Sequence, residues 1–388
     1  MNTLPIHENP NVPAARISIL ISTHNRAALL TKTLQSIYQL TPPAHEIIVI
    51  NDGSTDNTPQ VLSEQSNRIR FENRSNSGKS SAINRAAFLS TGDWIWICDD
   101  DDEVPPDAIA KFSSAIYQDS AADFIYGGIG WLTPSKNGEF EINTPLQYNL
   151  PKPDDLLGCL LVGQWIPSLC PIAIRRAIFL KIGGLSEKLR RVEDEEFALR
   201  LLTKATGASV NDCVYLARQH NGIRGAGSFS FSNEQREEID LKSLRSIYNE
   251  IYSAAPINFY RITKSNPHQI PAVPLIVRML TMFRVCHWEK CLADVIDLQN
   301  HKLSAQETSD ISYRIALSVS TFTRNKITDL FRSQLWNQLI KCNSITHTAI
   351  LVGIRKGLFW SIRNANHQKT GITTLLNFAI FLRALIKI

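Results

Sequence analysis

The sequence lacks the patterns that define several classes of protein. Its seven cysteines include no Cys-x-x-Cys pair, so neither a disulfide framework nor a zinc site is indicated. No uninterrupted apolar run reaches the roughly 20 residues of a membrane-spanning helix. The polar start of the chain, residues 1–15, has no apolar stretch of the kind that a secretory signal requires. These absences predict a folded cytoplasmic protein with reduced thiols.

Acidic residues are scarce near the end of the chain. Residues 311–388 contain eleven Lys/Arg and one acidic residue, Asp329, whereas the whole chain has a net charge of +5. A basic segment on an acidic body indicates an anionic partner. Apolar side chains among these cations favour peripheral contact with an anionic membrane surface. The alternative is that these helices pack together and their charges are solvated. Nucleic acid is not expected, because no recognised binding module accompanies the charge.

Apolar β-branched segments alternate with segments of helical periodicity in the first part of the chain. We expect strands at 16–23, 46–50, 69–73 and 93–98, and helices at 27–39 and 78–89. Ser54 or Thr55 is suitably placed to cap a helix after the second strand. Such alternation predicts an α/β fold with a doubly wound, mostly parallel, nucleotide-binding sheet.

The pattern changes after Pro105-Pro106. Segments 124–132 and 139–142 flank Asn137-Gly138 and predict a hairpin. Further expected elements are strands at 167–174 and 210–217 and a helix at 194–203, with an α-helical region beyond about 235. We therefore expect a tail at 1–15, a catalytic domain at 16–235 and a basic α-helical region at 236–388. The boundary falls between Phe231 and Pro274.

Polar residues follow three of the expected strands. Thr23-His24-Asn25, Asp52 and the run Asp99–Asp102 should converge, because ligands of such sheets bind beyond the carboxyl ends of the strands. Four adjacent carboxylates repel one another unless solvent or a cation separates them. Hard cations such as Mg²⁺ or Mn²⁺ prefer these oxygen ligands. A solvated acidic turn is the plainer alternative.

A second dense carboxylate cluster is Glu193–Glu196. A carboxylate with a raised pKa could act as a general base for an acceptor hydroxyl. The same four residues could simply form the acidic first turn of a helix, which the helix dipole favours.

Residues 16 to about 230 resemble the inverting family 2 glycosyltransferases, which have the A-type glycosyltransferase fold. The matching segments, in order, are Ile19–Arg26, Val49–Asp56, Asn76–Gly78 with Asn84, Ile97–Glu103 followed by Pro106, and Ile182–Leu185 leading to Glu193-Asp194. Each segment alone is a weak signal, but their order and spacing together are specific.

The resemblance implies roles for individual residues. Asp99 and Asp101 stand at the metal motif, with Asp101 favoured as the direct ligand, and Asp102 is expected to have a supporting role. Asp100 stands near the donor ribose. The other implied donor-binding residues are Thr23 and Asp52 at the nucleotide base, with Asn25, Arg26, Lys79 and Asn84 close by. Asp194 matches the catalytic base, which deprotonates the acceptor for a single displacement with inversion.

Three features of the sequence differ from the family's motifs or add to them. Ile83-Asn84 stands where family members often have Arg-Asn, so Lys79 or Arg85 is a candidate for the missing contact. The Gln-x-x-Arg-Trp motif of processive relatives is absent, which argues against repeated addition of sugars. His220 is a candidate additional metal ligand, although a lone His is more often a hydrogen-bonded surface residue. The remaining candidates are a loop at Gly222–Ser228 that closes over the donor with Arg224, and an acceptor pocket at Trp165 and Pro167. The loop could equally be a disordered connection to the next domain, and a tryptophan in the core is the commoner explanation for Trp165.

The predicted function is metal-dependent transfer of a sugar from a nucleoside-diphosphate sugar, most often a UDP-sugar in this family, to a hydroxyl of a glycan or lipid-linked acceptor. Mn²⁺ or Mg²⁺ is the implied cofactor, and surface-glycan assembly at the inner face of the plasma membrane is the implied setting. Two alternatives stand beside it: a non-catalytic nucleotide-sugar or carbohydrate-binding protein, and a nucleotidyltransferase on a related fold.

Overall fold

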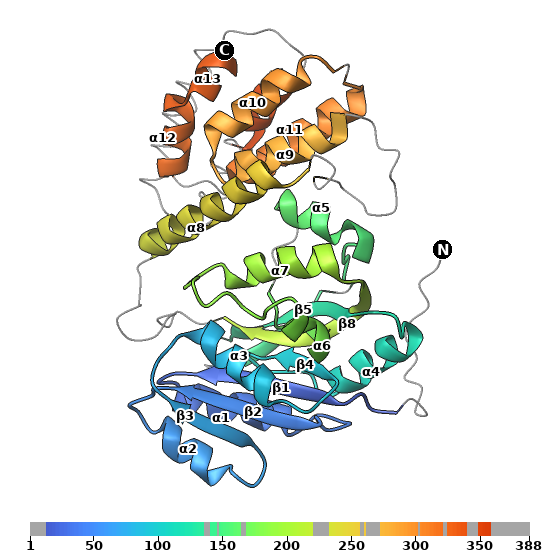
Figure 1. The fold of residues 1–388 in the computed structure, drawn as a ribbon, viewed down its shortest axis with the longest axis vertical. Helices are drawn as coiled ribbons and strands as arrows, with labels where there is room; N and C mark the ends of the chain where they lie inside the picture. Colours follow the sequence, from blue (N-terminus) through green and yellow to red (C-terminus); the bar gives the residue numbers. More distant parts are fainter. Residues whose placement is uncertain are drawn as a thin grey trace. The chain divides into compact units, whose positions relative to one another are not determined.

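The computed structural model describes residues 13–135, 140–145, 147–163, 168–219, 233–256, 260, 272–301, 303–320, 324–339 and 348–357. The chain folds as two compact units (Figure 1). The first comprises Met1–Asp154 and Pro167–Ile239, and the second comprises Asp155–Ile166 and Asp240–Ile388. Residues Leu156–Leu161 thus pack with a later helix, although they lie well before it in the sequence.

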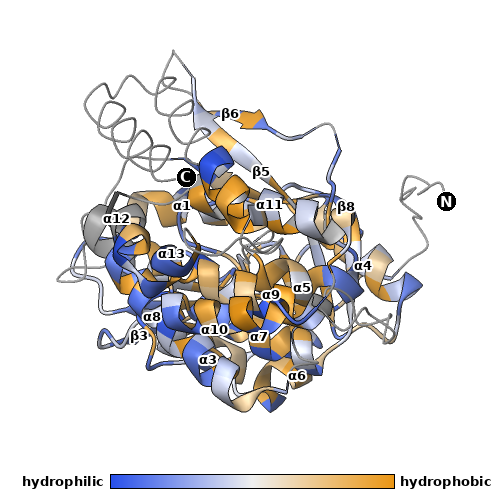
Figure 2. Ribbon diagram, turned by 90° about the horizontal axis from the view of Figure 1, so that it is seen from above, coloured by the Kyte–Doolittle hydropathy of each residue, from blue (hydrophilic) through white to orange (hydrophobic). Residues whose placement is uncertain are grey.

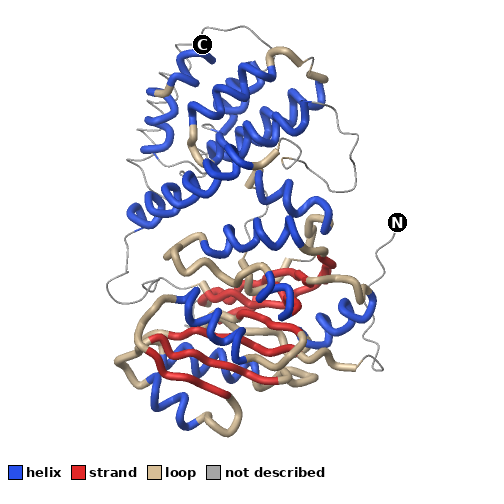
Figure 3. The backbone as a smooth tube through the Cα atoms, in the orientation of Figure 1, coloured by secondary structure: helices blue, strands red, loops and turns tan. Residues whose placement is uncertain are grey.

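The first unit is built on one mixed sheet (Figure 3). Its described strands are β1 (Ile17–Thr23), β2 (Glu46–Asp52), β3 (Arg70–Arg74), β4 (Trp94–Ile97), β5 (Phe124–Pro134), β6 (Phe140–Asn143), β7 (Ile172–Arg175) and β8 (Gly207–Arg218). The order is β3-β2-β1-β4-β7-β5-β6, with β8 paired to β5. Strands β1–β4 are parallel where they pair, as are β5 and β8, whereas β7 and β6 pair antiparallel to their neighbours. The predicted mostly parallel sheet is confirmed.

Helices flank this sheet. They are α1 (Ala27–Ile37), α2 (Thr58–Glu64), α3 (Lys79–Leu89), α4 (Ala108–Gln118), α6 (Arg176–Lys181) and α7 (Glu193–Lys204). The predicted helices at 27–39, 78–89 and 194–203 correspond to α1, α3 and α7, whereas α4 and α6 were not predicted.

The predicted cap of the next helix by Ser54 or Thr55 is wrong. Helix α2 begins at Thr58, and the Asp56 carboxylate accepts the Thr58 amide at 3.0 Å. The Ser54 hydroxyl instead accepts the amide of Asn25 at 2.9 Å. A tertiary contact between two loops therefore overrides the local capping preference.

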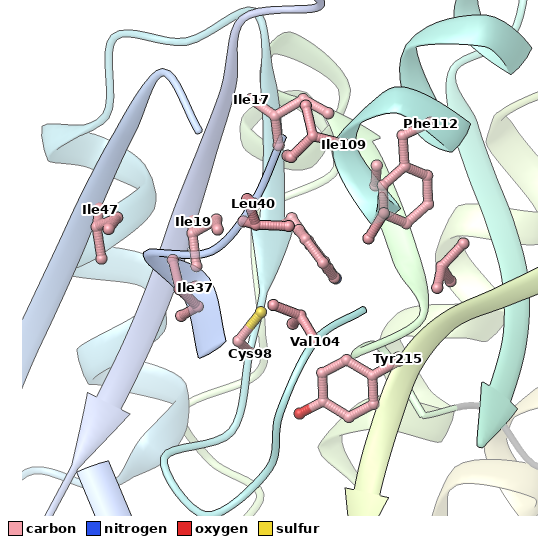
Figure 4. Close-up of a cluster of buried hydrophobic side chains, with 14 of the residues drawn as sticks. Ile17, Ile19, Ile37, Leu40, Ile47, Cys98, Val104, Ile109, Phe112 and Tyr215 are labelled. Carbon is pink, nitrogen blue, oxygen red and sulfur yellow. The ribbon is translucent and has the colours of Figure 1, made fainter. Parts of the chain in front are cut away.

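The core lies between the sheet and its helices (Figure 4). Ile19 of β1, Trp96 of β4 and Phe112 of α4 are fully buried, and the rings of Trp96 and Phe112 meet edge to face with centroids 5.1 Å apart. Strands buried on both faces are typically continuous apolar runs in sequence, which explains why β1, β2 and β4 could be predicted. Tyr215 of β8 also belongs to this core.

Strands β5 and β6 form the predicted hairpin: Trp131–Pro134 pairs with Phe140–Asn143. Its predicted Asn-Gly turn lies outside the described residues. Figure 2 shows apolar residues on β6, and two of them are exposed, Phe140 at 37% and Ile142 at 62%.

The second unit is α-helical, as predicted for the region beyond 235. Its helices are α5 (Leu156–Leu161), most of α8 (Asn233–Ala254), α9 (Ala272–Arg284), α10 (Trp288–Leu298), α11 (Ala305–Ser320), α12 (Arg324–Arg332) and α13 (Gln334–Leu339), and residues 348–357 are also helical. In its interior the buried Asp294 accepts a bond from Arg278 Nε at 2.8 Å. Among the described helices, none combines the length and apolarity needed to cross a membrane.

The structure predicts that truncating Phe112 destabilises the protein strongly. Phe112→Ala should lower the free energy of unfolding by about 3–5 kcal/mol, because the cavity cannot fully collapse. Phe88→Ala is the matched control: this side chain is 67% exposed, so its loss should change stability by less than about 0.5 kcal/mol. Urea unfolding of both variants measures the difference, and equal effects would contradict the assigned core.

Candidate active site

Two basic side chains pair with the carboxylates that follow β4. We call residues Asp99–Asp102 the acidic loop. Arg26, just after β1, donates from Nη1 to Asp100 Oδ1 at 2.8 Å and to Asp101 Oδ2 at 2.7 Å. Lys79, the first residue of α3, pairs through Nζ with Asp99 Oδ1 at 2.8 Å. The carboxyl ends of β1 and β4 and the start of α3 therefore converge.

Three carboxylates of the acidic loop could hold one cation. Asp99, Asp101 and Asp102 each offer an oxygen, and these atoms lie within 4.8 Å of one another. All three ligands are hard oxygens, the donor set that Mg²⁺ and Mn²⁺ prefer. The cluster includes both residues of the predicted motif and adds Asp102.

The electrostatics of the acidic loop reflect its crowding. Burial raises the pKa of Asp102 to about 7, and the charges of Asp99 and Asp101 raise it too. Burial likewise raises the pKa of Asp100 to about 6, against the opposing effect of Arg26. A bound cation would reverse this trend, because it favours the ionised carboxylates.

Asp102 is held from β8. Its Oδ2 accepts the Tyr215 hydroxyl at 3.0 Å and its Oδ1 accepts the Arg218 amide at 2.7 Å. The Tyr215 hydroxyl in turn accepts the Asp99 amide at 3.0 Å. One phenol thus ties together the two ends of the acidic loop.

Asp52, at the end of β2, organises the loop before α3. Its two carboxylate oxygens accept the amides of Ser77 at 2.7 Å and Gly78 at 2.8 Å. A Cβ on Gly53 would lie 2.7 Å from the Asn76 nitrogen, and Gly53 has a φ of 80°, so only glycine fits this turn. Asp52 therefore sets the start of α3. Thr23, at the end of the neighbouring strand β1, is buried, with 2% of its surface exposed.

Asn25 joins the loops that follow β1 and β2. It has a φ of 53°, a conformation that Asn tolerates better than most residues. Its Oδ1 accepts the Thr55 amide at 2.6 Å, and its Nδ2 lies 3.1 Å from His24 Nε2. The predicted contact of Asn25 with the donor stays a prediction.

Asn84 and Arg200 hold the turn before α7. The Asn84 side chain accepts the Leu185 amide at 2.8 Å and donates to the Leu185 carbonyl at 2.9 Å. Arg200 of α7 donates to the Gly184 carbonyl at 2.7 Å. A Cβ on Gly184 would lie 2.4 Å from Asn84 Oδ1. Asn84 thus connects α3 to the segment that leads to Asp194, and its donor-binding role stays a prediction.

Asp194 lies half-buried in the first turn of α7. Burial raises its pKa to about 7; the charge of Lys79 opposes this shift, whereas Glu193 and Asp99 add to it. A carboxylate with a pKa near neutrality can accept a proton efficiently. Lys79 pairs directly with Asp99 and interacts electrostatically with Asp194, so it links the acidic loop to this carboxylate.

Some sequence-based candidates lie outside the described residues: His220, the loop Gly222–Ser228 with Arg224, and Trp165 with Pro167. Conversely, the sequence analysis assigned no role to Tyr215 or Arg218, which contact the acidic loop. The strand predicted at 210–217 includes Tyr215 and stops just before Arg218. Only the pairing of β8 reveals which of its side chains face the loop.

Comparison with known proteins finds a family match for part of the chain. Residues 18–179 match Glycosyl transferase family 2. An uncharacterised glycosyltransferase of Haemophilus influenzae is 32% identical over 195 residues, covering 48% of this chain and 62% of the relative. A Mycoplasma pneumoniae relative, also an uncharacterised glycosyltransferase, is 35% identical over 109 residues, covering 26% of this chain and 36% of the relative. The chain therefore spans less than two thirds of these relatives.

The fold is similar to that of a solved structure, S. aureus TarS 1-349 in complex with UDP-GlcNAc. The TM-score is 0.51 at 17% identity, and the match covers 90% of this chain and 92% of that one. At this identity the likeness bears on the fold alone. Together with the sheet order and the acidic loop at the end of β4, these matches identify residues 18–179 as a segment of the glycosyltransferase family 2 type with the A-type fold.

Proposed function

We propose that this protein transfers a sugar from a nucleoside-diphosphate sugar to an acceptor hydroxyl by a single displacement with inversion. The proposal rests on Lys79, which interacts with two groups of carboxylates. One is the acidic loop, which could hold a metal ion, and the other is the half-buried Asp194. These centres supply the two requirements of the reaction, which are stabilisation of a leaving diphosphate and a base for the acceptor.

A divalent cation fits the residues present. Asp101 with Asp99, supported by Asp102, would hold Mn²⁺ or Mg²⁺, and His220 is proposed from the sequence as a further ligand. When bound, the cation supplies Lewis-acid stabilisation of negative charge on the diphosphate. Lys79 and Arg26, which pair with these carboxylates, would then add positive charge at the same place.

The donor is proposed to bind along the ends of β1 and β2. Thr23 and Asp52 would face the nucleotide base, Asp100 the ribose, and Arg26 and Lys79 the phosphates. Asn25 and Asn84 complete this set by fixing the loops that carry the others. A UDP-sugar is the proposed donor, in keeping with the complex of TarS with UDP-GlcNAc.

Asp194 is proposed to accept the proton of the acceptor hydroxyl. The contacts of Asn84 with Leu185 and of Arg200 with Gly184 hold the turn from which the chain leads to α7. The acceptor is proposed to be a glycan or a lipid-linked sugar in surface-glycan assembly. The basic segment at 311–388 would favour peripheral contact with an anionic membrane surface on the cytoplasmic side.

Removing the proposed base should abolish transfer but leave donor binding intact. Asp194→Asn should lower kcat by about 100- to 10,000-fold, with an unchanged Kd for UDP measured by calorimetry. Glu193→Gln, a neighbouring carboxylate change, should retain transfer. If Asp194→Asn keeps full transferase activity, the assigned base is wrong. If the wild-type protein binds UDP-sugars but transfers nothing to any acceptor, a binding function replaces the enzymatic one.

The rate of transfer should increase with pH through about 7 at saturating donor and Mn²⁺. The pKa of Asp194 is raised to about 7, so below that pH its carboxyl group is protonated and cannot accept the acceptor proton. Because Glu193 contributes to the raised pKa, Glu193→Gln should move the acidic limb of the pH–rate profile to lower pH. A profile that is level from about pH 5 to pH 8 would contradict this assignment.

Donor binding should depend on the cation through Asp101. With Mn²⁺ present, UDP at about 100 times its Kd should stabilise the wild-type protein by about 2.7 kcal/mol, which thermal unfolding measures as a rise in Tm. EDTA or Asp101→Asn should remove most of that rise. Asp93→Asn is the control, because this carboxylate is 64% exposed and lies just before β4 rather than after it. An unchanged rise in Asp101→Asn would argue against the cation site.

A further inference from the structure

The end of β8 is attached to the acidic loop and the residue after it. Glu103 and Leu216 exchange two backbone hydrogen bonds, each at 3.0 Å. Two residues further on, the Arg218 amide donates to the Asp102 carboxylate at 2.7 Å. The conformation of the acidic loop is therefore set in part from a strand that contributes none of its carboxylates.

The Arg218 side chain extends this attachment. Its Nε donates to the Asp101 carbonyl at 2.9 Å, and its Nη2 pairs with the Glu103 carboxylate. The side chain is only 3% exposed. Its guanidinium carbon lies 4.4 Å from the centroid of the Phe140 ring in the β5–β6 hairpin. Arg218 thus contacts the acidic loop on one side and an aromatic ring on another.

The bond to the Asp101 carbonyl has a consequence for the carboxylates. That carbonyl belongs to the peptide between Asp101 and Asp102, two of the three residues that offer oxygens to one cation. Fixing the plane of this peptide limits the directions in which both side chains can leave the backbone. Partners of this kind, which orient ligands without touching the cation, strongly influence metal affinity.

We propose that Arg218 is a positioning residue for the cation site of the acidic loop. The inference rests on the proposed function, because it presumes that the loop binds a cation. The planar guanidinium can donate to Asp101 and Glu103 at once and stack on Phe140, whereas a lysine ammonium at this position cannot do all three. Arg218 acts through the loop and is not itself a ligand.

Arg175 provides a matched control. It ends β7, stacks on Trp94 with its guanidinium carbon 4.7 Å from the ring centroid, and donates from Nε to the Ala122 carbonyl at 2.8 Å. It pairs in register with the first residue of β4, which is the end of that strand away from the acidic loop. At either position, lysine removes a guanidinium that stacks on an aromatic ring and donates to a backbone carbonyl, but only Arg218 contacts the acidic loop.

The test is a titration of the full-length protein with Mn²⁺ alone, in which electron paramagnetic resonance reports the free ion. Arg218→Lys should raise the Kd for Mn²⁺ by about 10- to 100-fold, whereas Arg175→Lys should leave it unchanged even where its Tm falls comparably. Phe140→Ala, at a partly exposed position, should raise the Kd by about threefold through loss of the stacking contact alone. If Arg218→Lys does not fold, the Kd of Phe140→Ala tests the positioning role of Arg218 instead.

The outcomes separate the two proposals. Wild-type affinity for Mn²⁺ in the folded Arg218→Lys variant, or in Phe140→Ala if the lysine variant does not fold, overturns the positioning role and leaves the proposed transfer reaction intact. Equal weakening by Arg175→Lys assigns the effect to general loss of stability and also overturns it. If the wild-type protein binds no Mn²⁺, the cation site of the proposed function fails and the positioning role fails with it.

Discussion

Mutual repulsion among the carboxylates of the acidic loop is the constraint on which the rest of the site depends. Four adjacent aspartates follow the buried strand β4, and two of them have a pKa raised to about 6 and about 7. Arg26 and Lys79 hold the loop from one direction, and Tyr215 and Arg218 hold it from β8. These contacts keep three carboxylates close enough to share a cation instead of letting them move apart.

Some residues around the acidic loop carry the proposed reaction, and others fix the loops in which those residues lie. Asp52 fixes the loop that begins α3 and thereby sets Lys79, whereas Asn84 and Arg200 fix the turn that leads to Asp194. Lys79 lies between the two centres, where it pairs with one carboxylate and lowers the pKa of the other. Because Asp99 raises and Lys79 lowers the pKa of Asp194, the charge of the acidic loop influences the protonation of the proposed base.

Much of this arrangement follows from the sequence. Continuous apolar strands alternating with helices predict a parallel sheet, and its carboxyl edge brings Arg26, Lys79 and the acidic loop together without knowledge of any contact. The roles of Tyr215 and Arg218 could not be predicted, because they depend on the pairing of β8 with β5, which shifts register around Gly128. The capping of α2 was mispredicted for a related reason: Ser54 bonds to Asn25, which lies 29 residues earlier in the chain. Long-range contacts decided both cases.

The acidic loop is proposed to bind a cation together with the donor diphosphate. Crystals of the full-length protein grown with Mn²⁺ and UDP would reveal such a cation by anomalous scattering at the manganese edge. We expect a manganese peak about 2.0–2.6 Å from a carboxylate oxygen of Asp101 and in contact with the diphosphate. Ordered UDP with no manganese at Asp99–Asp102, or manganese held by other carboxylates, would contradict it.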